Sequence, residues 1–185
     1  MFKDIIVVEN VFDDADFLIE FSRKQTFFEK ENHPTESKSK WVGRRTINIG
    51  DIDQEVYNKC VSEIILKSSE TCFGKITPFK IEWKWNGHVY FHKMDYTNQP
   101  TDSWLHTDES NLYAGIVYLN KNPKPNSGTT IYKNNNPMFV QNVYNRLVLY
   151  RSDYRHASQG GFDGGLDNRL TLNLFFKELN INIKS

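Results

Sequence analysis

The chain has 185 residues, the size of a single domain, and its 23 basic and 23 acidic residues give a formal net charge of zero. This balance argues against a broad electrostatic surface for nucleic acid or an anionic membrane, so we expect neither as a partner. No apolar run reaches the roughly 20 residues of a membrane span, the N-terminus becomes acidic too early for a signal peptide, and the two cysteines make no disulfide framework. We therefore expect a cytoplasmic protein, and the sequence leaves its oligomeric state open.

The N-terminal region begins with a short β-rich run at residues 5–8, which we predict as a strand. Asp13 or Asp14 then provides an N-cap and a favourable negative charge at the start of a helix. Phe17 and Phe21 lie four residues apart and belong to the apolar face of that helix.

The clearest helix begins after Asp53, which we expect to be its N-cap. Val56, Cys60 and Ile64 follow at four-residue intervals, so their side chains share one face. The helix is predicted to run to about Glu70 and to cover one face of a sheet, with its cysteines as packing residues.

Between the two helices the chain is polar. The stretch Glu29–Lys40 has no periodicity and predicts a loop, in which His33 is expected to be solvated. The segment Lys38–Arg45 is the densest basic piece and contains Trp41; it either contacts an anionic substrate or is a solvated loop. A short strand is predicted at Arg45–Ile49.

From residue 76 onward the pattern is that of strands separated by turns. The predicted strands are 79–85, 88–92, 112–119, 129–132, 138–140, 146–150 and 169–176. Asn86-Gly87 is the strongest hairpin signal between two of them. Strands at such intervals indicate a sandwich or barrel. We expect a mainly β (α+β) fold in one domain, residues 1–185, with a helical support region at 1–75 and a β core at 76–178.

The last strand alternates almost completely. Leu170, Leu172, Leu174 and Phe176 share one face, which suits packing against the helical layer; the opposite face holds Arg169, Thr171, Asn173 and Phe175. In a sandwich that second face lines the interior between the sheets. A guanidinium there needs a carboxylate partner, and a ligand carboxylate bound through two N–H groups would serve.

His106 and Asp108 are two residues apart, so in an extended segment their side chains point to the same side. With His156 they offer two imidazoles and one carboxylate, a set that suits non-haem Fe(II) with open coordination positions. Zinc is the competing ion for the same ligands. His88 and His92 share a strand face as well, either as a second metal site or as part of a polar wall that contacts the substrate.

The spacing His106-x-Asp108, then His156, then Arg169, among strands, resembles the Fe(II)- and 2-oxoglutarate-dependent dioxygenases, and within them the prolyl-4-hydroxylase-like group. Two further matches support that group: Tyr96, ten residues before the first histidine, and Ser127-Gly128-Thr129-Thr130-Ile131-Tyr132, which is similar to its Gly-Gly-x-Thr-x-Phe strand. The resemblance covers about residues 80 to 177. Prolyl hydroxylases usually carry lysine at the place of the arginine, which puts prolyl substrates in doubt.

The resemblance implies a double-stranded β-helix, or jelly roll, with an N-terminal helical layer. It implies that His106, Asp108 and His156 are the metal ligands and form the catalytic centre for Fe(II) and O2. The cosubstrate 2-oxoglutarate would be held by Arg169, with Tyr96, Thr130 and Thr171 assisting.

The expected activity is hydroxylation of a peptidyl, amino-acid or small-molecule substrate with release of succinate and CO2. The carboxylate of Asp108 argues for hydroxylation, since related halogenases lack it. The alternative is a non-catalytic or zinc-bound cupin-like β-sandwich that binds a ligand. The loop Glu29–Arg45 and the surroundings of Trp104 and Tyr113 are predicted as lids or walls, and Arg151 and Arg155 as solvent-facing.

Overall fold

The computed structural model describes residues 2–35, 41–74, 81–94, 105–159 and 169–183. Within these ranges the elements are β1 (Ile5–Val8), α1 (Ala15–Arg23), β2 (Phe28–Glu29), a 3-10 helix η1 (Lys30–Asn32), β3 (Arg44–Arg45), α2 (Ile49–Ile52), α3 (Gln54–Phe73), β4 (Ile81–Met94), β5 (Tyr113–Tyr118), β6 (Gly128–Lys133), β7 (Asn136–Gln141), β8 (Leu147–Arg151), β9 (Arg155–Gln159) and β10 (Arg169–Ile183).

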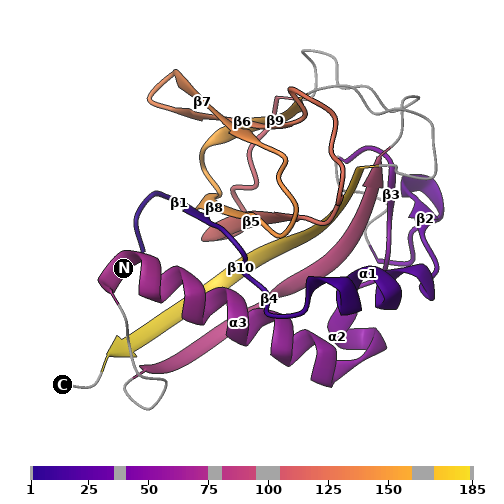
Figure 1. The fold of residues 1–185 in the computed structure, drawn as a ribbon, viewed down its shortest axis with the longest axis horizontal. Helices are drawn as coiled ribbons and strands as arrows, with labels where there is room; N and C mark the ends of the chain where they lie inside the picture. The colour runs from indigo at the N-terminus through magenta and orange to yellow at the C-terminus, as the bar shows by residue number, and fades with distance from the viewer. Residues whose placement is uncertain (1, 36–40, 75–80, 95–104, 160–168, 184–185) are drawn as a thin grey trace.

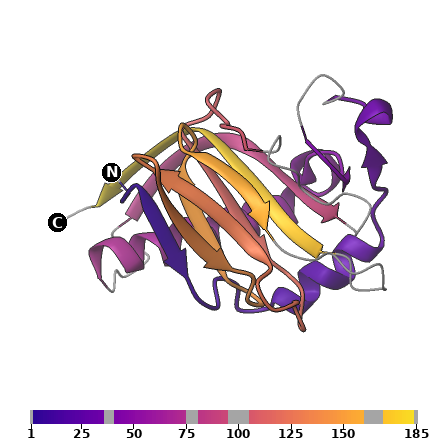
Figure 2. The ribbon, with the colours of Figure 1, turned by 90° about the horizontal axis from the view of Figure 1, so that it is seen from above.

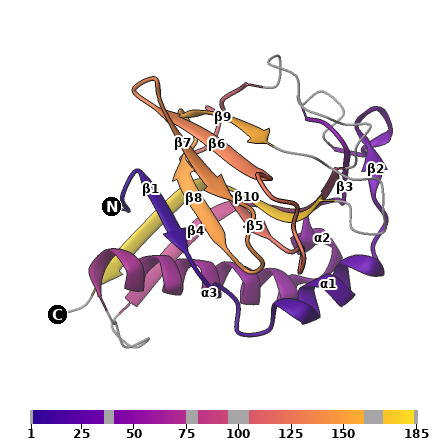
Figure 3. The ribbon, with the colours of Figure 1, turned by 45° about the horizontal axis from the view of Figure 1, so that its top comes forward.

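The strands form two antiparallel sheets. The large sheet has seven strands in the order β1-β8-β5-β10-β4-β3-β2, and the small sheet has three in the order β7-β6-β9. Figure 1 shows three layers, with α1, α2 and α3 on one side of the large sheet and the small sheet on the other. Figure 3 shows the small sheet over β8, β5 and β10. The mainly β fold, with its helices in the N-terminal region, is as predicted.

Side-chain caps explain where the two longer helices begin. The carboxylate of Asp14 accepts from the backbone N–H of Phe17 at 3.0 Å, so Asp14 is the cap of α1. Asp53 accepts from the N–H groups of Glu55 and Val56, both at 3.0 Å, and begins α3 as predicted. The helix α3 ends at Gly74, whose φ of +85° is readily adopted only by glycine. No helix in the described part of the chain is long and apolar enough to cross a membrane.

The large sheet has a different core on each face. Toward the helices, β10 presents Leu170, Leu172, Leu174 and Phe176, which pack in one cluster with Val56, Cys60, Val61 and Ile64 of α3. Toward the small sheet, a second cluster contains Ala114, Ile116, Tyr118, Ile131, Val140, Val148 and Tyr150. The predicted division of β10 into two faces is confirmed.

The predicted hairpin at Asn86-Gly87 is wrong. The strand β4 runs without a break through both residues and pairs with β10 along its whole length, as the long adjacent strands in Figure 2 show. A Cβ atom on Gly87 would lie 2.2 Å from the backbone oxygen of Phe175. Glycine is therefore required at this position because β4 and β10 approach closely beside a shift in their register. The chain makes no turn there.

The segment before α3 also differs from prediction. The strand expected at Arg45–Ile49 is only β3, and a helical turn, α2, follows it. The side chains of Thr46 and Asn48 explain the change, because they accept hydrogen bonds from the backbone of β4 at Phe91 and Val89 (3.1 and 3.0 Å) in place of a continuing ladder.

His33 is buried, and the prediction that it is solvated is wrong. Its Nε2 lies 3.0 Å from the carbonyl oxygen of Thr46, and its ring makes edge contacts with Phe28, Trp41 and Tyr90. These contacts attach part of the predicted loop to the sheet.

Candidate metal centre and cosubstrate cavity

The segment that carries His106 is held against β9 by the backbone. The N–H of His106 donates to the carbonyl of His156 at 3.2 Å, and the reverse bond is 2.9 Å long. The backbone N–H of Asp108 donates to the carbonyl of Ser152 at 2.8 Å. Two residues 48 positions away from each other in the sequence, Asp108 and His156, are thereby placed side by side.

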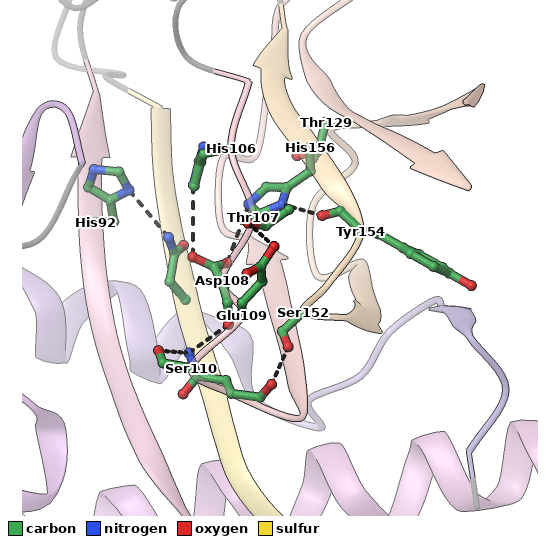
Figure 4. Close-up of polar contacts among 12 residues, drawn as sticks. His92, His106, Thr107, Asp108, Glu109, Ser110, Thr129, Ser152, Tyr154 and His156 are labelled. Carbon is green, nitrogen blue, oxygen red and sulfur yellow. Dashed lines mark hydrogen bonds and ion pairs between the residues drawn. The ribbon is translucent and has the colours of Figure 1, made fainter. Parts of the chain in front are cut away.

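The three predicted metal ligands converge, as Figure 4 shows. The Nε2 atoms of His106 and His156 lie 3.9 and 3.4 Å from the two carboxylate oxygens of Asp108. One ligand atom from each residue falls within 4.8 Å of the others, and no other such group of three is found among the described residues. The set of two imidazole nitrogens and one carboxylate oxygen fits a divalent metal ion with positions left open.

The protonation state of His156 suits this role. Its Nδ1 lies 3.1 Å from the carbonyl oxygen of Tyr154, and since a carbonyl only accepts, this nitrogen carries the proton. The lone pair is then on Nε2, which faces Asp108. Burial lowers the pKa of His156 to about 4, so the ring is neutral near pH 7.

Arg169 lies at the start of β10 and is buried between the sheets. Its guanidinium donates to the hydroxyls of Ser158 (2.5 Å) and Thr129 (3.2 Å) and to the carbonyl of Gly128 (3.3 Å), and it lies over the ring of Tyr118. Burial lowers the pKa of Arg169. These four groups are neutral and hold the guanidinium in a fixed orientation.

The residues predicted to assist Arg169 have three different outcomes. The structure places Thr129, and not Thr130, against the guanidinium, because successive side chains of β6 alternate and Ile131 shares the inner face with Thr129. The hydroxyl of Thr171 donates to Asn173 Oδ1 at 2.7 Å. Tyr96 lies outside the described residues.

The triad and Arg169 open onto one cavity of about 470 Å³, within the usual range for small-molecule sites. Among the described residues its walls are Trp41, Val42, Arg45, His88, His92, Met94, His106, Thr107, Asp108, Glu109, Ser110, Asn111, Gly115, Ile116, Tyr150, His156, Ser158, Arg169, Asn173, Phe175 and Lys177.

The predicted walls are confirmed in part. Trp41 and Arg45, from the end of the predicted loop, line the cavity. Tyr113 does not, because it is buried toward the N-terminus and its hydroxyl donates to the carbonyl of Phe2. Trp104 lies outside the described residues. Arg151 and Arg155 are exposed as predicted and bond to Asp153 and Asn135.

His92 forms part of the wall opposite the triad. Its Nε2 bonds to the carbonyl of Val42, and its Nδ1 lies 3.3 Å from the side-chain nitrogen of Asn173. Burial and the nearby Arg45 lower the pKa of His92 to about 3, so the ring is neutral. Sequence patterns do not predict the pairing with Asn173, because the two residues are 81 positions apart; alternation predicts only that Asn173 faces the interior between the sheets.

Comparison with protein-family models and with curated proteins finds no match. Among solved structures, a Pseudomonas putida prolyl-4-hydroxylase is 14% identical, with a TM-score of 0.58 over 95% of this chain and 92% of its own. The non-heme alpha ketoglutarate dependent epimerase SnoN from nogalamycin biosynthesis is 10% identical (TM-score 0.59, 98% and 81% covered). HygX from Streptomyces hygroscopicus, solved with nickel and 2-oxoglutarate bound, is 11% identical (TM-score 0.57, 94% and 82% covered). The chain thus has the fold that prolyl hydroxylases share with other 2-oxoglutarate-dependent iron enzymes.

Proposed function

We propose that this protein is an Fe(II)- and 2-oxoglutarate-dependent oxygenase. The observation that carries the proposal is the convergence of His106, Asp108 and His156 on the cavity that also receives Arg169. The shared fold supports it, because the similar structures described above are a prolyl-4-hydroxylase, an alpha ketoglutarate dependent epimerase and a protein solved with nickel and 2-oxoglutarate bound. We further propose that the two sheets are the two halves of a jelly roll, and that the chain is one domain with support region 1–75 and core 76–178.

In this proposal His106, Asp108 and His156 hold the metal. Iron(II) with 2-oxoglutarate supplies an oxidant for a C–H bond from O2, with release of succinate and CO2. The carbonyl of Tyr154 holds the ring of His156 in the tautomer that presents Nε2. The charge of Asp108 offsets part of the charge of the metal.

In this proposal the charged guanidinium of Arg169 attracts the far carboxylate of the cosubstrate. Ser158 and Thr129 orient the guanidinium, so Thr129 takes the place that the sequence assigned to Thr130. Tyr96 stays a proposed cosubstrate contact, and Thr171 acts through Asn173.

The product chemistry proposed is hydroxylation of a small-molecule, amino-acid or peptidyl substrate. The similar structures include both a prolyl hydroxylase and an epimerase, so the shared fold does not choose between these reactions. The proposal of hydroxylation therefore rests on the carboxylate of Asp108, and analysis of the reaction product tests it.

The test is anaerobic titration of the protein with Fe(II) and 2-oxoglutarate. We expect the weak visible charge-transfer band of chelated iron, followed by O2-dependent succinate release when substrates are screened. Asp108→Ala should lose the band, whereas Glu109→Gln, one position along, should retain it. A protein that binds zinc tightly but gives neither band nor succinate would instead be the ligand-binding sandwich.

A further inference from the structure

Buried polar groups normally have hydrogen-bond partners, and Tyr150 departs from this rule. The residue is 1% exposed, yet its hydroxyl makes no hydrogen bond with any described residue. Two other buried tyrosines show the usual arrangement. The hydroxyl of Tyr113 donates to the carbonyl of Phe2 at 3.2 Å, and that of Tyr118 lies 2.7 Å from the hydroxyl of Thr129. The phenol of Tyr150 therefore carries a donor that no described residue accepts.

This hydroxyl borders the cavity that contains the triad and Arg169. Tyr150 lines the cavity from β8, and its oxygen is not one of the unpaired atoms that are sealed in the core. Its ring lies against that of His156, with 4.8 Å between the ring centres. Burial raises the pKa of Tyr150; of the nearby charges, Asp108 raises it further and Arg169 lowers it. The hydroxyl is thus within electrostatic reach of both the triad and the guanidinium.

The ring of Tyr150 is fixed by its packing. It pairs with Ala114 across β8 and β5 and belongs to the apolar cluster that includes Ile116 and Val148. A phenol has an ordinary pKa near 10, so at pH 7 the hydroxyl keeps its proton. The side chain therefore offers a ligand a donor at a fixed place in the cavity wall.

A ligand that joins the triad to Arg169 supplies the missing acceptor. In the proposed function, 2-oxoglutarate extends from the metal to the guanidinium, and Tyr150 borders the same space. The carboxylate and keto oxygens of this molecule all accept hydrogen bonds, and a bond to a charged carboxylate is the stronger kind.

We propose that Tyr150 is a further binding residue for the cosubstrate, whose hydroxyl donates a hydrogen bond to an oxygen of 2-oxoglutarate between the triad and Arg169. This inference rests on the proposed function and deepens it, because it adds a residue to the cosubstrate site. The sequence has no signal for this role, since an aromatic residue in a buried strand is most simply a packing residue.

Removal of the hydroxyl alone tests the proposal. Tyr150→Phe keeps the ring and loses no hydrogen bond to a described residue, so the free energy of unfolding should stay the same or rise. The affinity for 2-oxoglutarate should fall at least about fivefold, because the ligand loses one donor. Urea unfolding measures the stability, and calorimetry of the Zn(II)-loaded protein measures the affinity.

Tyr113→Phe is the matched control. It also removes the hydroxyl of a buried tyrosine, but this hydroxyl donates to the carbonyl of Phe2 and Tyr113 lies outside the cavity walls. The control should therefore lower the free energy of unfolding and leave the affinity for 2-oxoglutarate unchanged. The two variants are expected to have opposite effects, which a purely structural role for Tyr150 would not produce.

The proposal is overturned if Tyr150→Phe binds 2-oxoglutarate as tightly as the native protein. It is also overturned if the variant loses as much affinity for Zn(II) as for 2-oxoglutarate, since the ring would then only support His156.

The same measurements separate this contact from the proposed function. If 2-oxoglutarate binds through Tyr150 but Fe(II) gives no charge-transfer band, the contact stands and the oxygenase proposal fails. A band in the native protein with unchanged affinity in Tyr150→Phe has the opposite meaning. If the native protein binds no 2-oxoglutarate, both proposals fail.

Discussion

The two faces of β10 are built from alternate residues of one strand, yet they have different chemistry. Toward the helices, Leu170, Leu172 and Leu174 are buried among apolar side chains. On the face toward the small sheet, Arg169 bonds to polar groups of β6 and β9. Asn173 bonds to His92 of β4 and accepts a hydrogen bond from Thr171. Residues that stabilise the core and residues proposed to bind ligands are thus separated across a single sheet. Substitutions on one face should therefore leave the property of the other face intact.

The largest effect is expected at the three proposed metal ligands, which lie outside β10. His106→Ala removes one of three ligand atoms, so the loss of Fe(II) affinity should exceed the roughly 10- to 100-fold that loss of an outer supporting group costs. Anaerobic Fe(II) binding measures it. His92→Ala, on the opposite wall, should keep tight iron binding; equal losses in the two variants would contradict the assignment of ligands.

Leu172→Ala tests the helix-facing side. Leu172 is fully buried, so the lost burial and the cavity should lower the free energy of unfolding by about 2 to 5 kcal/mol. Urea unfolding gives the loss. Affinity for 2-oxoglutarate, measured on the folded fraction at low temperature, should not change, and a parallel fall in affinity would break the separation of the two faces.

Arg169→Ala tests the cavity-facing side. Removing a buried guanidinium from a carboxylate should weaken 2-oxoglutarate binding by about 2 to 5 kcal/mol. Calorimetry of the Zn(II)-loaded protein measures this, with Arg151→Ala as an exposed control on β8. An unchanged affinity would mean that another residue holds the cosubstrate.

The neutral His92 predicts a pH effect on stability. Its pKa is about 3 in the folded protein against an ordinary 6.5, because it is buried beside Arg45 and, farther away, Arg169. Above pH 6.5 the ring is neutral in both states; below it the unfolded chain binds a proton that the folded protein excludes, so stability falls with falling pH. This contribution amounts to about 2 kcal/mol between pH 7 and pH 5.

Urea unfolding of His92→Gln across that pH range measures the effect. The variant should lose less stability than the native protein as the pH falls. Identical slopes would show that His92 takes up its proton in the folded state.

The smallest effect is expected in the helical layer. Asp53→Ala removes the side-chain acceptor for two N–H groups at the start of α3 and should cost about 1 kcal/mol. Thermal unfolding measures it, and Asp53→Asn, which keeps an acceptor, should recover most of the loss. A larger loss with impaired ligand binding would show that α3 also positions the cavity.

Much of the fold and site was predictable from local patterns. The alternation in β10 identified both of its faces, and Asp53 identified the start of α3, because periodicity and caps depend on residues close together in the chain. The hairpin at Asn86-Gly87 was mispredicted for the same reason. A glycine that forms a turn and a glycine that allows a neighbouring strand to approach look identical in sequence. Only the structure distinguishes them, because a Cβ atom on Gly87 would lie 2.2 Å from the backbone oxygen of Phe175.

The residue types of the proposed site can be read from local patterns: His106 and Asp108 on one side of an extended segment, a distant His156, and an arginine at an inward-facing strand position. The tertiary structure alone decided which partners these residues meet. The bridge between His106 and His156 completes the triad, the alternation of β6 selects Thr129 over Thr130, and β4 brings His92 to Asn173. The physical reason is that side-chain chemistry belongs to single residues, whereas distance and burial arise only when strands far apart in the chain pair.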